Sequence, residues 1–214
     1  MSERTTGLIL RTRLLTETSL IVQWLTADFG RFSTVAKGAR SPKSPFSGKL
    51  DLFYFAEFNF IRSRRSDLHT LCELSLLQTH GTLRRNLPSL QQAAYCAALI
   101  EHATEPEAPI PGIFHLFKDV LAWLAAAPPQ PRTIFAFELK FLRELGLEPD
   151  LANTRLSAPA KHLLKSMLDT DWPALAQLKP AQRQIVELRQ FLYSFLNYHL
   201  EKLPPTRNAA LKAA

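Results

Sequence analysis

The chain has 214 residues, of which 46% are hydrophobic and 21% charged, and its formal net charge is +7 with a pI near 9.6. This length allows one large or two small domains with a buried core, and the composition is that of a globular protein. The excess positive charge points to polyanionic partners, nucleic acid first and an anionic membrane second. No window approaches the roughly 20 apolar residues that span a bilayer, and the first residues lack a signal-peptide pattern. We therefore expect a cytoplasmic protein without a membrane partner.

The first 80 residues carry the alternating patterns of short strands separated by turns. Five strands are predicted, over residues 8–13, 19–26, 31–37, 50–61 and 68–77. In the fourth, Phe58 and Phe60 share one face; in the fifth, the shared face is Leu68, Thr70, Cys72, Leu74 and Leu76. Five strands without a helix favour a closed barrel, because closure removes exposed edges, and the OB-fold is the most economical choice. Phe53, Tyr54 and Phe55 are candidates for stacking bases, although we expect most of them in the core.

From about residue 81 the hydrophobic period becomes helical. Helices are predicted over residues 90–104, 113–126, 133–145, 160–168 and 181–200, while the tail from 204 to 214 is expected to fray. The predicted fold is therefore α+β with two domains. Residues 1–80 form a five-stranded OB-fold that binds nucleic acid, and residues 81–214 form an all-helical domain that binds partners.

A basic loop follows the third predicted strand. Between residues 31 and 49 there are five basic residues and no acidic one: Arg31, Lys37, Arg40, Lys43 and Lys49. The glycines and serines between them allow close approach to a phosphate backbone, and each cation can displace a condensed counterion. The alternative is a solvated, mobile hairpin loop. A second basic cluster, Arg62, Arg64 and Arg65, falls at the turn between the fourth and fifth strands.

Catalytic and metal-binding patterns are missing from the sequence. The two cysteines, Cys72 and Cys96, are too few for a cysteine-rich zinc site and are expected in the core. The six histidines are scattered, the seven glycines form no phosphate loop, and the barrel's acids are spread apart. We therefore expect no enzyme activity, no catalytic residues, no metal and no cofactor.

Several motifs resemble those of the bacterial RecO recombination mediators. They are Arg11, the run from Glu17 to Leu20, Thr26, Gly30, the segment VAKGAR from Val35 to Arg40, Lys43-Ser44 and Gly48-Lys49-Leu50. Phe137-Glu138-Leu139 with Leu145-Gly146-Leu147 looks like that family's FEL helix, and Tyr198-His199-Leu200 with Leu203-Pro204 and Arg207 looks like a degraded C-terminal signature. The resemblance covers most of the chain and is strongest from residue 8 to residue 50.

The resemblance implies an N-terminal OB-fold, a helical C-terminal domain and a non-enzymatic role in recombinational repair. Such a protein binds single- and double-stranded DNA, anneals complementary strands and, with its partner RecR, helps to load RecA onto DNA coated by single-strand-binding protein. The DNA contacts would be Arg31, Lys37, Arg40, Lys43 and Lys49, to which we add Arg62, Arg64 and Arg65 from charge alone. The acidic, apolar tail of single-strand-binding protein would suit a groove near the third helix, at Arg132, Phe135, Lys140 and Arg143.

The chain departs from that family in two places. Many members carry a four-cysteine zinc module after the FEL helix, whereas residues 148–159 contain no cysteine. Pro205-Thr206 stands where the C-terminal signature has a second lysine. Two other functions remain open: an OB-fold accessory protein that binds RNA, and a helical interaction protein whose barrel is only a scaffold.

Overall fold

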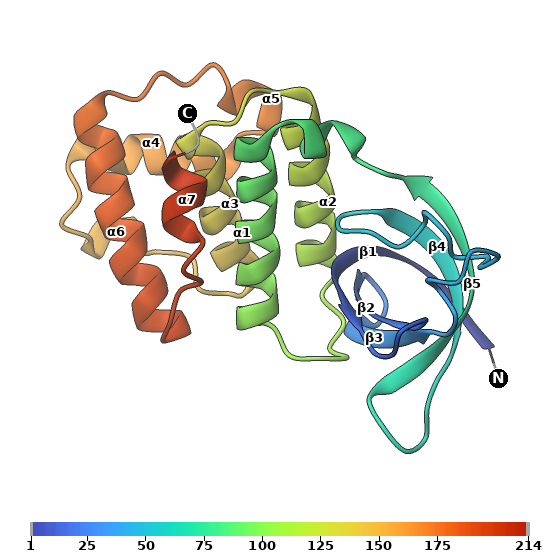
Figure 1. The fold of residues 1–214 in the computed structure, drawn as a ribbon. Coiled ribbons are helices and arrows are strands. Elements are labelled where there is room, and N and C mark those ends of the chain that lie inside the picture. The colour runs from blue at the N-terminus through green and yellow to red at the C-terminus, as the bar shows by residue number, and fades with distance from the viewer. Residues whose placement is uncertain (1, 213–214) are drawn as a thin grey trace. The chain divides into compact units, whose positions relative to one another are not determined.

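The computed structural model describes residues 2–212, which form two compact units. The first is the chain up to Gly81 together with Thr104–Lys118, and the second is Thr82–Ala103 together with the chain from Asp119 onward. The sequence predicts that everything after residue 80 belongs to the helical domain. The structure differs, since residues 104–118 group with the strands (Figure 1).

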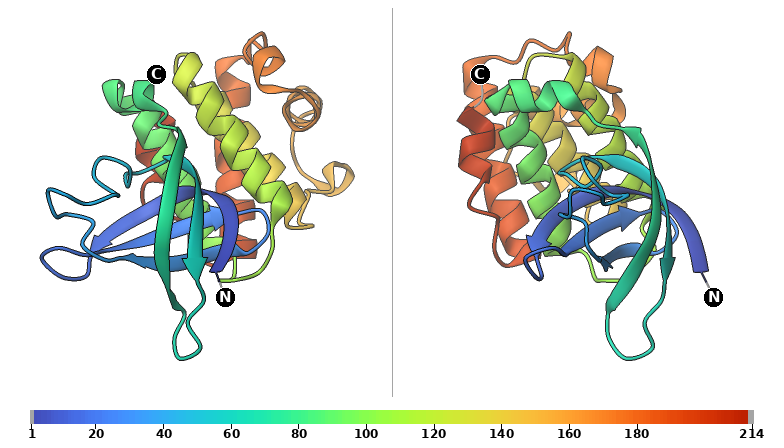
Figure 2. Two further views of the ribbon diagram at one scale, coloured as in Figure 1. Left: turned by 90° about the vertical axis from the view of Figure 1, so that its right-hand side faces the viewer. Right: turned by 45° about the vertical axis from the view of Figure 1, so that its right-hand side comes forward.

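The first unit is a closed five-stranded barrel. Its strands are β1 (Ser2–Leu14), β2 (Leu20–Thr26), β3 (Gly30–Ala36), β4 (Phe55–Ile61) and β5 (Leu68–Gln78). They follow one another around the barrel as β1-β2-β3-β5-β4, with β1 antiparallel to β4 and β3 parallel to β5 (Figure 2). The predicted α+β fold with an N-terminal OB-fold is thereby confirmed.

Three details of the strand prediction are wrong. The first strand begins at Ser2 rather than at residue 8. The fourth strand begins at Phe55 rather than at residue 50, because Phe53 adopts a left-handed backbone with φ 64° that interrupts an extended run. In β5 a register shift opposite Asn59 and Phe60 moves the buried side from His69 and Leu71 to Leu74. A bulge of this kind inserts one residue and switches faces, which an unbroken period of two cannot anticipate.

Aromatic side chains fill the barrel. Trp24 stacks on Phe58 with ring centroids 4.0 Å apart, and its indole N–H donates to the Thr34 hydroxyl at 2.8 Å. Phe32 and Phe60 pack beside them with centroids 4.7 Å apart. The buried polar atom of the tryptophan is thus satisfied within the core, as burial requires.

Side chains of β3 and the β4–β5 turn hold the segment that follows the first long helix. The buried Arg31 donates from its guanidinium to the carbonyl and to the hydroxyl of Thr104, and its own carbonyl accepts from the Glu107 N–H at 2.8 Å. At Gly30, which has φ +65°, a Cβ would lie 1.9 Å from the Ala108 carbonyl oxygen. These contacts explain why residues 104–118 belong to the barrel unit.

The second unit is built from helices. The chain forms α1 (Leu87–Ala103), α2 (Pro111–Ala126), α3 (Pro131–Glu144), α4 (Ala158–Asp169), α5 (Trp172–Leu175), α6 (Gln182–Leu200) and α7 (Arg207–Lys212), with short 3-10 turns at Gly81–Arg85 and Leu151–Asn153. The α2 helix begins in the first unit and ends in the second. The α3 helix packs against α1, α4, α5, α6 and α7, so it is the centre of this unit. Within residues 2–212, none of the helices is both long and apolar enough to cross a bilayer.

The chain between residues 204 and 212 forms a helix where the sequence predicts fraying, and residues 213–214 of that tail lie outside the described residues. Its α7 helix is held by Arg207, which pairs with the fully buried Glu138 through two hydrogen bonds of 2.6 and 2.9 Å. The Tyr95 hydroxyl donates to the same carboxylate at 2.5 Å, and burial raises the pKa of that hydroxyl well above its usual range, with Glu138 adding to the effect. Gln92 donates to the Ala210 carbonyl at 3.1 Å. These partners lie far apart in the sequence, so a local pattern could not reveal them.

Replacing Arg207 with methionine should destabilise the protein, because Glu138 would remain buried without its ionic partner. We expect the free energy of unfolding to fall by about 3–5 kcal/mol in denaturant titrations. Arg183→Met, on an exposed position of α6, is the control and should change it by no more than about 0.5 kcal/mol. The double variant Glu138→Leu/Arg207→Met should recover part of the loss. Equal stability of Arg207→Met and the control would show that the pair does not hold α7.

A side chain at residue 30 should disrupt the packing of β3 against the backbone of Ala108, in the segment that follows α1. Gly30→Ala places a Cβ against backbone, which has no alternative position, and adds the strain of a left-handed alanine. We expect a loss of at least about 2 kcal/mol of unfolding free energy. Gly146→Ala, where φ is +72° but no atom lies within 4 Å of the added Cβ, isolates the backbone cost. A loss no larger than that of Gly146→Ala would contradict the steric account.

Candidate nucleic-acid interface

The basic loop, defined as residues 37–49, has a regular backbone. Hydrogen bonds between residues three apart follow one another along it, joining Ala36 to Ala39, Gly38 to Ser41, Ser41 to Ser44, Ser44 to Ser47 and Phe46 to Lys49 at 2.9–3.4 Å. Gly38 supplies the left-handed φ of 63° that the first of these turns needs. The loop is therefore a series of tight turns.

Two apolar side chains anchor the basic loop in the barrel. Ala39 and Phe46 are 7% and 6% exposed and belong to the same buried cluster as Trp24 and Phe58. Fully burying a phenylalanine contributes about 1.5–3 kcal/mol, so lifting the loop away from the barrel is costly. These two residues therefore attach the backbone that carries the cations to the barrel.

The β1–β2 hairpin is bonded to the basic loop. The backbone N–H and the guanidinium of Arg40 donate to the carbonyls of Thr18 and Glu17, both at 2.9 Å. The Gly38 N–H donates to the Ser19 hydroxyl at 3.2 Å. The tip of the hairpin and the basic loop therefore form one hydrogen-bonded surface.

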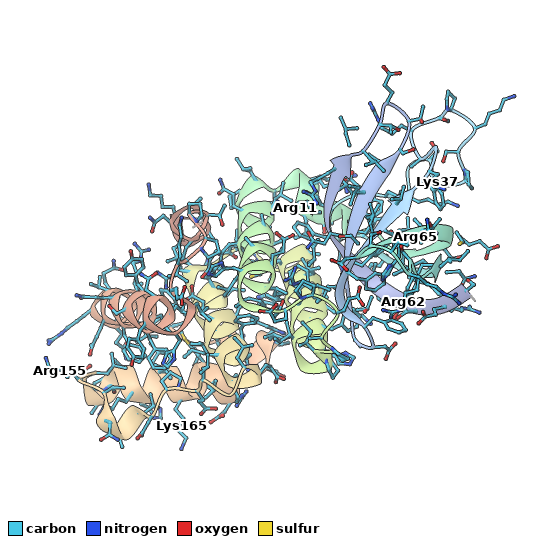
Figure 3. All side chains as sticks on the ribbon, turned by 90° about the horizontal axis from the view of Figure 1, so that it is seen from below. Arg11, Lys37, Arg62, Arg65, Arg155 and Lys165 are labelled. Atoms are coloured by element: carbon cyan, nitrogen blue, oxygen red, sulfur yellow. The ribbon has the colours of Figure 1, made fainter. Side chains whose placement is uncertain are left out.

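The structure brings together four of the five basic residues predicted at this site. Lys37, which Figure 3 labels, is exposed. Arg40 and Lys43 are also exposed, and Lys49 is half-buried. Arg31 does not join them, because it is 7% exposed and its guanidinium bonds to Thr104. Its positive charge is used inside the barrel unit, a role that a count of charges cannot distinguish from binding.

The second basic cluster is divided in a similar way. Arg64 and Arg65 are exposed, whereas Arg62 pairs with Glu3 at 2.9 Å and with Glu107 at 2.7 Å. Figure 3 labels Arg62 and Arg65. The hydrogen bond to Glu3 is the main cause that raises the pKa of Arg62. Its charge is balanced locally, so a phosphate would have to compete with two carboxylates for it.

Sequence reasoning did not count two further cations. Arg11 and Arg13 are exposed on β1 and alternate with the half-buried Thr12. Both lie on the strand that leads to the hairpin tip. The alternation of Arg11 and Arg13 around Thr12 in a predicted strand is the sequence feature that indicates two cations on one face.

The four positions predicted to bind a partner do not form one groove. Phe135 is 1% exposed and belongs to the core. Lys140 and Arg143 both donate to the Leu168 carbonyl, at 2.8 and 2.7 Å, and so cap the last turn of α4. Burial lowers the pKa of Lys140. These three side chains therefore stabilise the helical unit: Phe135 packs in its core, and Lys140 and Arg143 bind the end of α4.

Arg132 is placed differently from the other three. It lines a mainly apolar hollow of about 120 Å³, formed with Trp123, Ala127, Pro128, Gln130, Thr133, Leu175 and Ala176. One of its guanidinium nitrogens donates to the Leu178 carbonyl at 2.6 Å. The hollow combines apolar walls with a cation, which suits an apolar residue next to a carboxylate.

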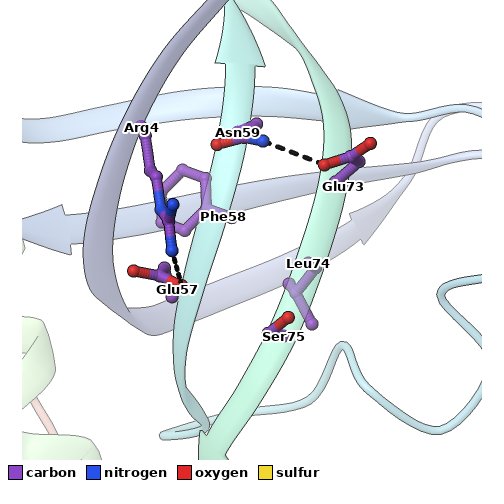
Figure 4. A pocket seen from close by; sticks show the side chains of 7 residues that line it. All are labelled: Arg4, Glu57, Phe58, Asn59, Glu73, Leu74 and Ser75. Atoms are coloured by element: carbon purple, nitrogen blue, oxygen red, sulfur yellow. Dashed lines mark hydrogen bonds and ion pairs between the residues drawn. The ribbon is translucent and has the colours of Figure 1, made fainter.

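A second hollow, of about 160 Å³, lies on the outer face of β4 and β5 (Figure 4). Its two carboxylates are engaged: Glu57 accepts from Arg4 at 2.5 Å, and Glu73 accepts from Asn59 at 2.9 Å. The Arg4 hydrogen bond lowers the pKa of Glu57. Among residues 2–212 no three His, Cys, Asp or Glu side chains gather as a metal site.

Two family models match the chain. Residues 1–80 match the model for the N terminus of recombination protein O, and residues 84–155 match the model for its C terminus. The first match covers the barrel strands, and the second ends before α4.

Curated relatives agree with these matches. The chain is 36% identical to "DNA repair protein RecO" of Anaeromyxobacter dehalogenans strain 2CP-C, over 72% of this chain and 61% of that protein. It is 33% identical to the protein of the same name from Rhodopirellula baltica, over 67% of this chain and 53% of the relative. The corresponding values for Salinibacter ruber are 31%, 72% and 60%. The matched part thus spans little more than half the length of these relatives, and on these matches the chain belongs to the RecO family of DNA repair proteins.

Proposed function

We propose that this chain is a DNA-binding recombination mediator that holds single and double strands by their phosphates through the basic loop. The observation that carries this proposal is the exposure of Lys37, Arg40 and Lys43 on a turn-rich loop that contains no acidic residue. Each cation that neutralises a phosphate releases condensed counterions, which favours binding without reading sequence. Lys49 lies on the same loop, and Arg64 and Arg65 on the β4–β5 turn form a second, separate contact.

Annealing and RecA loading are the activities that we infer for this surface. A protein that contacts phosphates leaves the base edges of its strand free to pair with a complementary strand. The chain then anneals complementary strands and, with RecR, helps to load RecA onto DNA coated by single-strand-binding protein. The names of the relatives, which are DNA repair proteins, support DNA over the RNA alternative.

Neutralising the three exposed cations should weaken binding and flatten its salt dependence. For Lys37→Ala/Arg40→Ala/Lys43→Ala we expect the slope of log K against log salt to fall by roughly one unit per lost phosphate contact. The measurement is fluorescence anisotropy of a labelled single strand across a salt series. Arg155→Ala/Lys165→Ala/Arg183→Ala removes the same charge from exposed positions of the helical unit and is the control. An unchanged slope in the first variant would remove the basic loop from the interface.

The mediator activity itself is tested by annealing. Complementary oligonucleotides precoated with single-strand-binding protein should anneal faster with the protein, and the acceleration should fade as salt rises. DNA binding without acceleration would contradict the mediator proposal. Tighter binding to a matched RNA strand than to DNA would favour the RNA-binding alternative, and no binding to either at low salt would favour the scaffold alternative.

We further propose that the hollow beside Arg132 receives the acidic, apolar tail of single-strand-binding protein. Its walls suit an apolar terminal residue, and the guanidinium suits a carboxylate. Arg132→Ala should weaken binding of a labelled tail peptide by roughly fivefold to tenfold at low salt, equivalent to about 1–1.4 kcal/mol. Arg143→Ala is the control, because Arg143 caps α4. Equal loss in both variants would point to net charge and contradict the site.

A further inference from the structure

The tip of the β1–β2 hairpin exposes two consecutive leucines. Leu14 is 66% exposed and Leu15 is 45% exposed. Among the large apolar side chains that residues 2–212 expose, no others are neighbours in the chain. Neither has a role in the core or in the phosphate-binding surface proposed above.

The hairpin tip is held in place. The N–H groups of Leu15 and Thr16 donate to the Ser19 carbonyl at 3.0 and 3.3 Å, and the Ser19 N–H donates to the Thr16 hydroxyl at 3.1 Å. Arg40 bonds the tip to the basic loop through the carbonyls of Thr18 and Glu17. The two leucines therefore keep a fixed position beside the proposed phosphate contacts.

The surroundings indicate what the leucines would contact. Residues 11–49 contain seven basic and two acidic residues, and all the basic side chains except the buried Arg31 are exposed or half-buried, which favours a polyanion as the occupant of this surface. Of the two acids, Asp28 accepts from the Thr5 hydroxyl at 3.3 Å, and Glu17 lies on the tip itself. A polyanion that also offers flat apolar surfaces is a single-stranded nucleic acid with unstacked bases.

We propose that Leu14 and Leu15 form an apolar wedge against the bases of a single strand whose phosphates lie on the basic loop. Leucine is one of the residues that proteins insert between base steps to unstack them. The wedge would keep bases apart and accessible while the cations hold the backbone. This inference rests on the proposed DNA binding and adds the base-contacting part of the same surface.

The experiment uses the full chain and a single strand carrying the fluorescent base 2-aminopurine, whose emission rises when it is unstacked. Wild type should raise the emission, and Leu14→Ser/Leu15→Ser should lose most of that rise. The double variant should keep the salt slope and lose less than about fivefold in affinity, because the phosphate contacts remain. Leu77→Ser, at a 54% exposed position of β5, is the control and should behave as wild type.

A second variant tests the wedge by gain of contact. Leu15→Trp should bind the single strand more tightly, by at least about threefold, and its added indole emission should be quenched, because aromatic rings stack on bases more strongly than aliphatic chains. Unchanged affinity and emission would overturn the wedge.

The outcomes separate the two proposals. No DNA binding by wild type would refute the proposed function, whereas binding with equal 2-aminopurine signals in wild type and in the double serine variant would refute the wedge alone. Vesicles containing anionic phosphatidylglycerol test the other polyanionic surface. Vesicle binding that depends on the leucines, with an unchanged 2-aminopurine signal, would assign the tip to a membrane and overturn the proposal.

Discussion

The position of the basic loop depends on the aromatic core of the barrel. Phe46 and Ala39 lie in the same cluster as the stacked Trp24 and Phe58, so lifting these two residues away from the barrel would open part of that core. A flexible cationic loop would lose conformational entropy on each encounter with a polyanion. A loop that the core orders before binding would gain from counterion release without that cost.

The helical unit is organised around a buried charge. The Glu138 carboxylate has no exposure to water, so its stability in the core requires the hydrogen bonds from Arg207 and Tyr95. That requirement brings α7 against α3 and turns a short polar tail into a packed helix. The FEL segment and the C-terminal arginine noted in the sequence are thus two halves of one structural interaction.

The fold could be predicted from the sequence where its determinants are local. Alternation and turn residues placed the strands, and the helical period with proline and glycine stops placed the long helices. The left-handed backbone of Phe53 and the bulge in β5 interrupt an otherwise regular pattern, so the sequence pattern does not predict them. The α7 helix is not predicted, because Arg207 is buried through its pairing with Glu138, which lies far away in the chain.

The candidate site was predictable only in part for the same reason. Charge located the basic loop, but Arg31 and Arg62 carry the same charge and serve internal contacts to Thr104 and to Glu3 and Glu107. Phe135 likewise reads as a surface candidate until its burial is seen. A sequence reports that a cation is present, whereas only tertiary structure decides whether its partner lies inside or outside the molecule.

The aromatic residues of the barrel bear on how it could contact bases. Phe53 is buried against Phe117, and the Lys118 ammonium lies 4.5 Å from the centre of the half-buried Phe55 ring. Tyr54 is half-buried and packs against the barrel core. Among the described residues of the barrel unit, the exposed large apolar side chains are all aliphatic. Aliphatic contacts hold bases less tightly than aromatic stacking. A surface of cations and leucines would therefore bind a strand mainly by its backbone and release its bases readily, which is the property that pairing with a second strand requires.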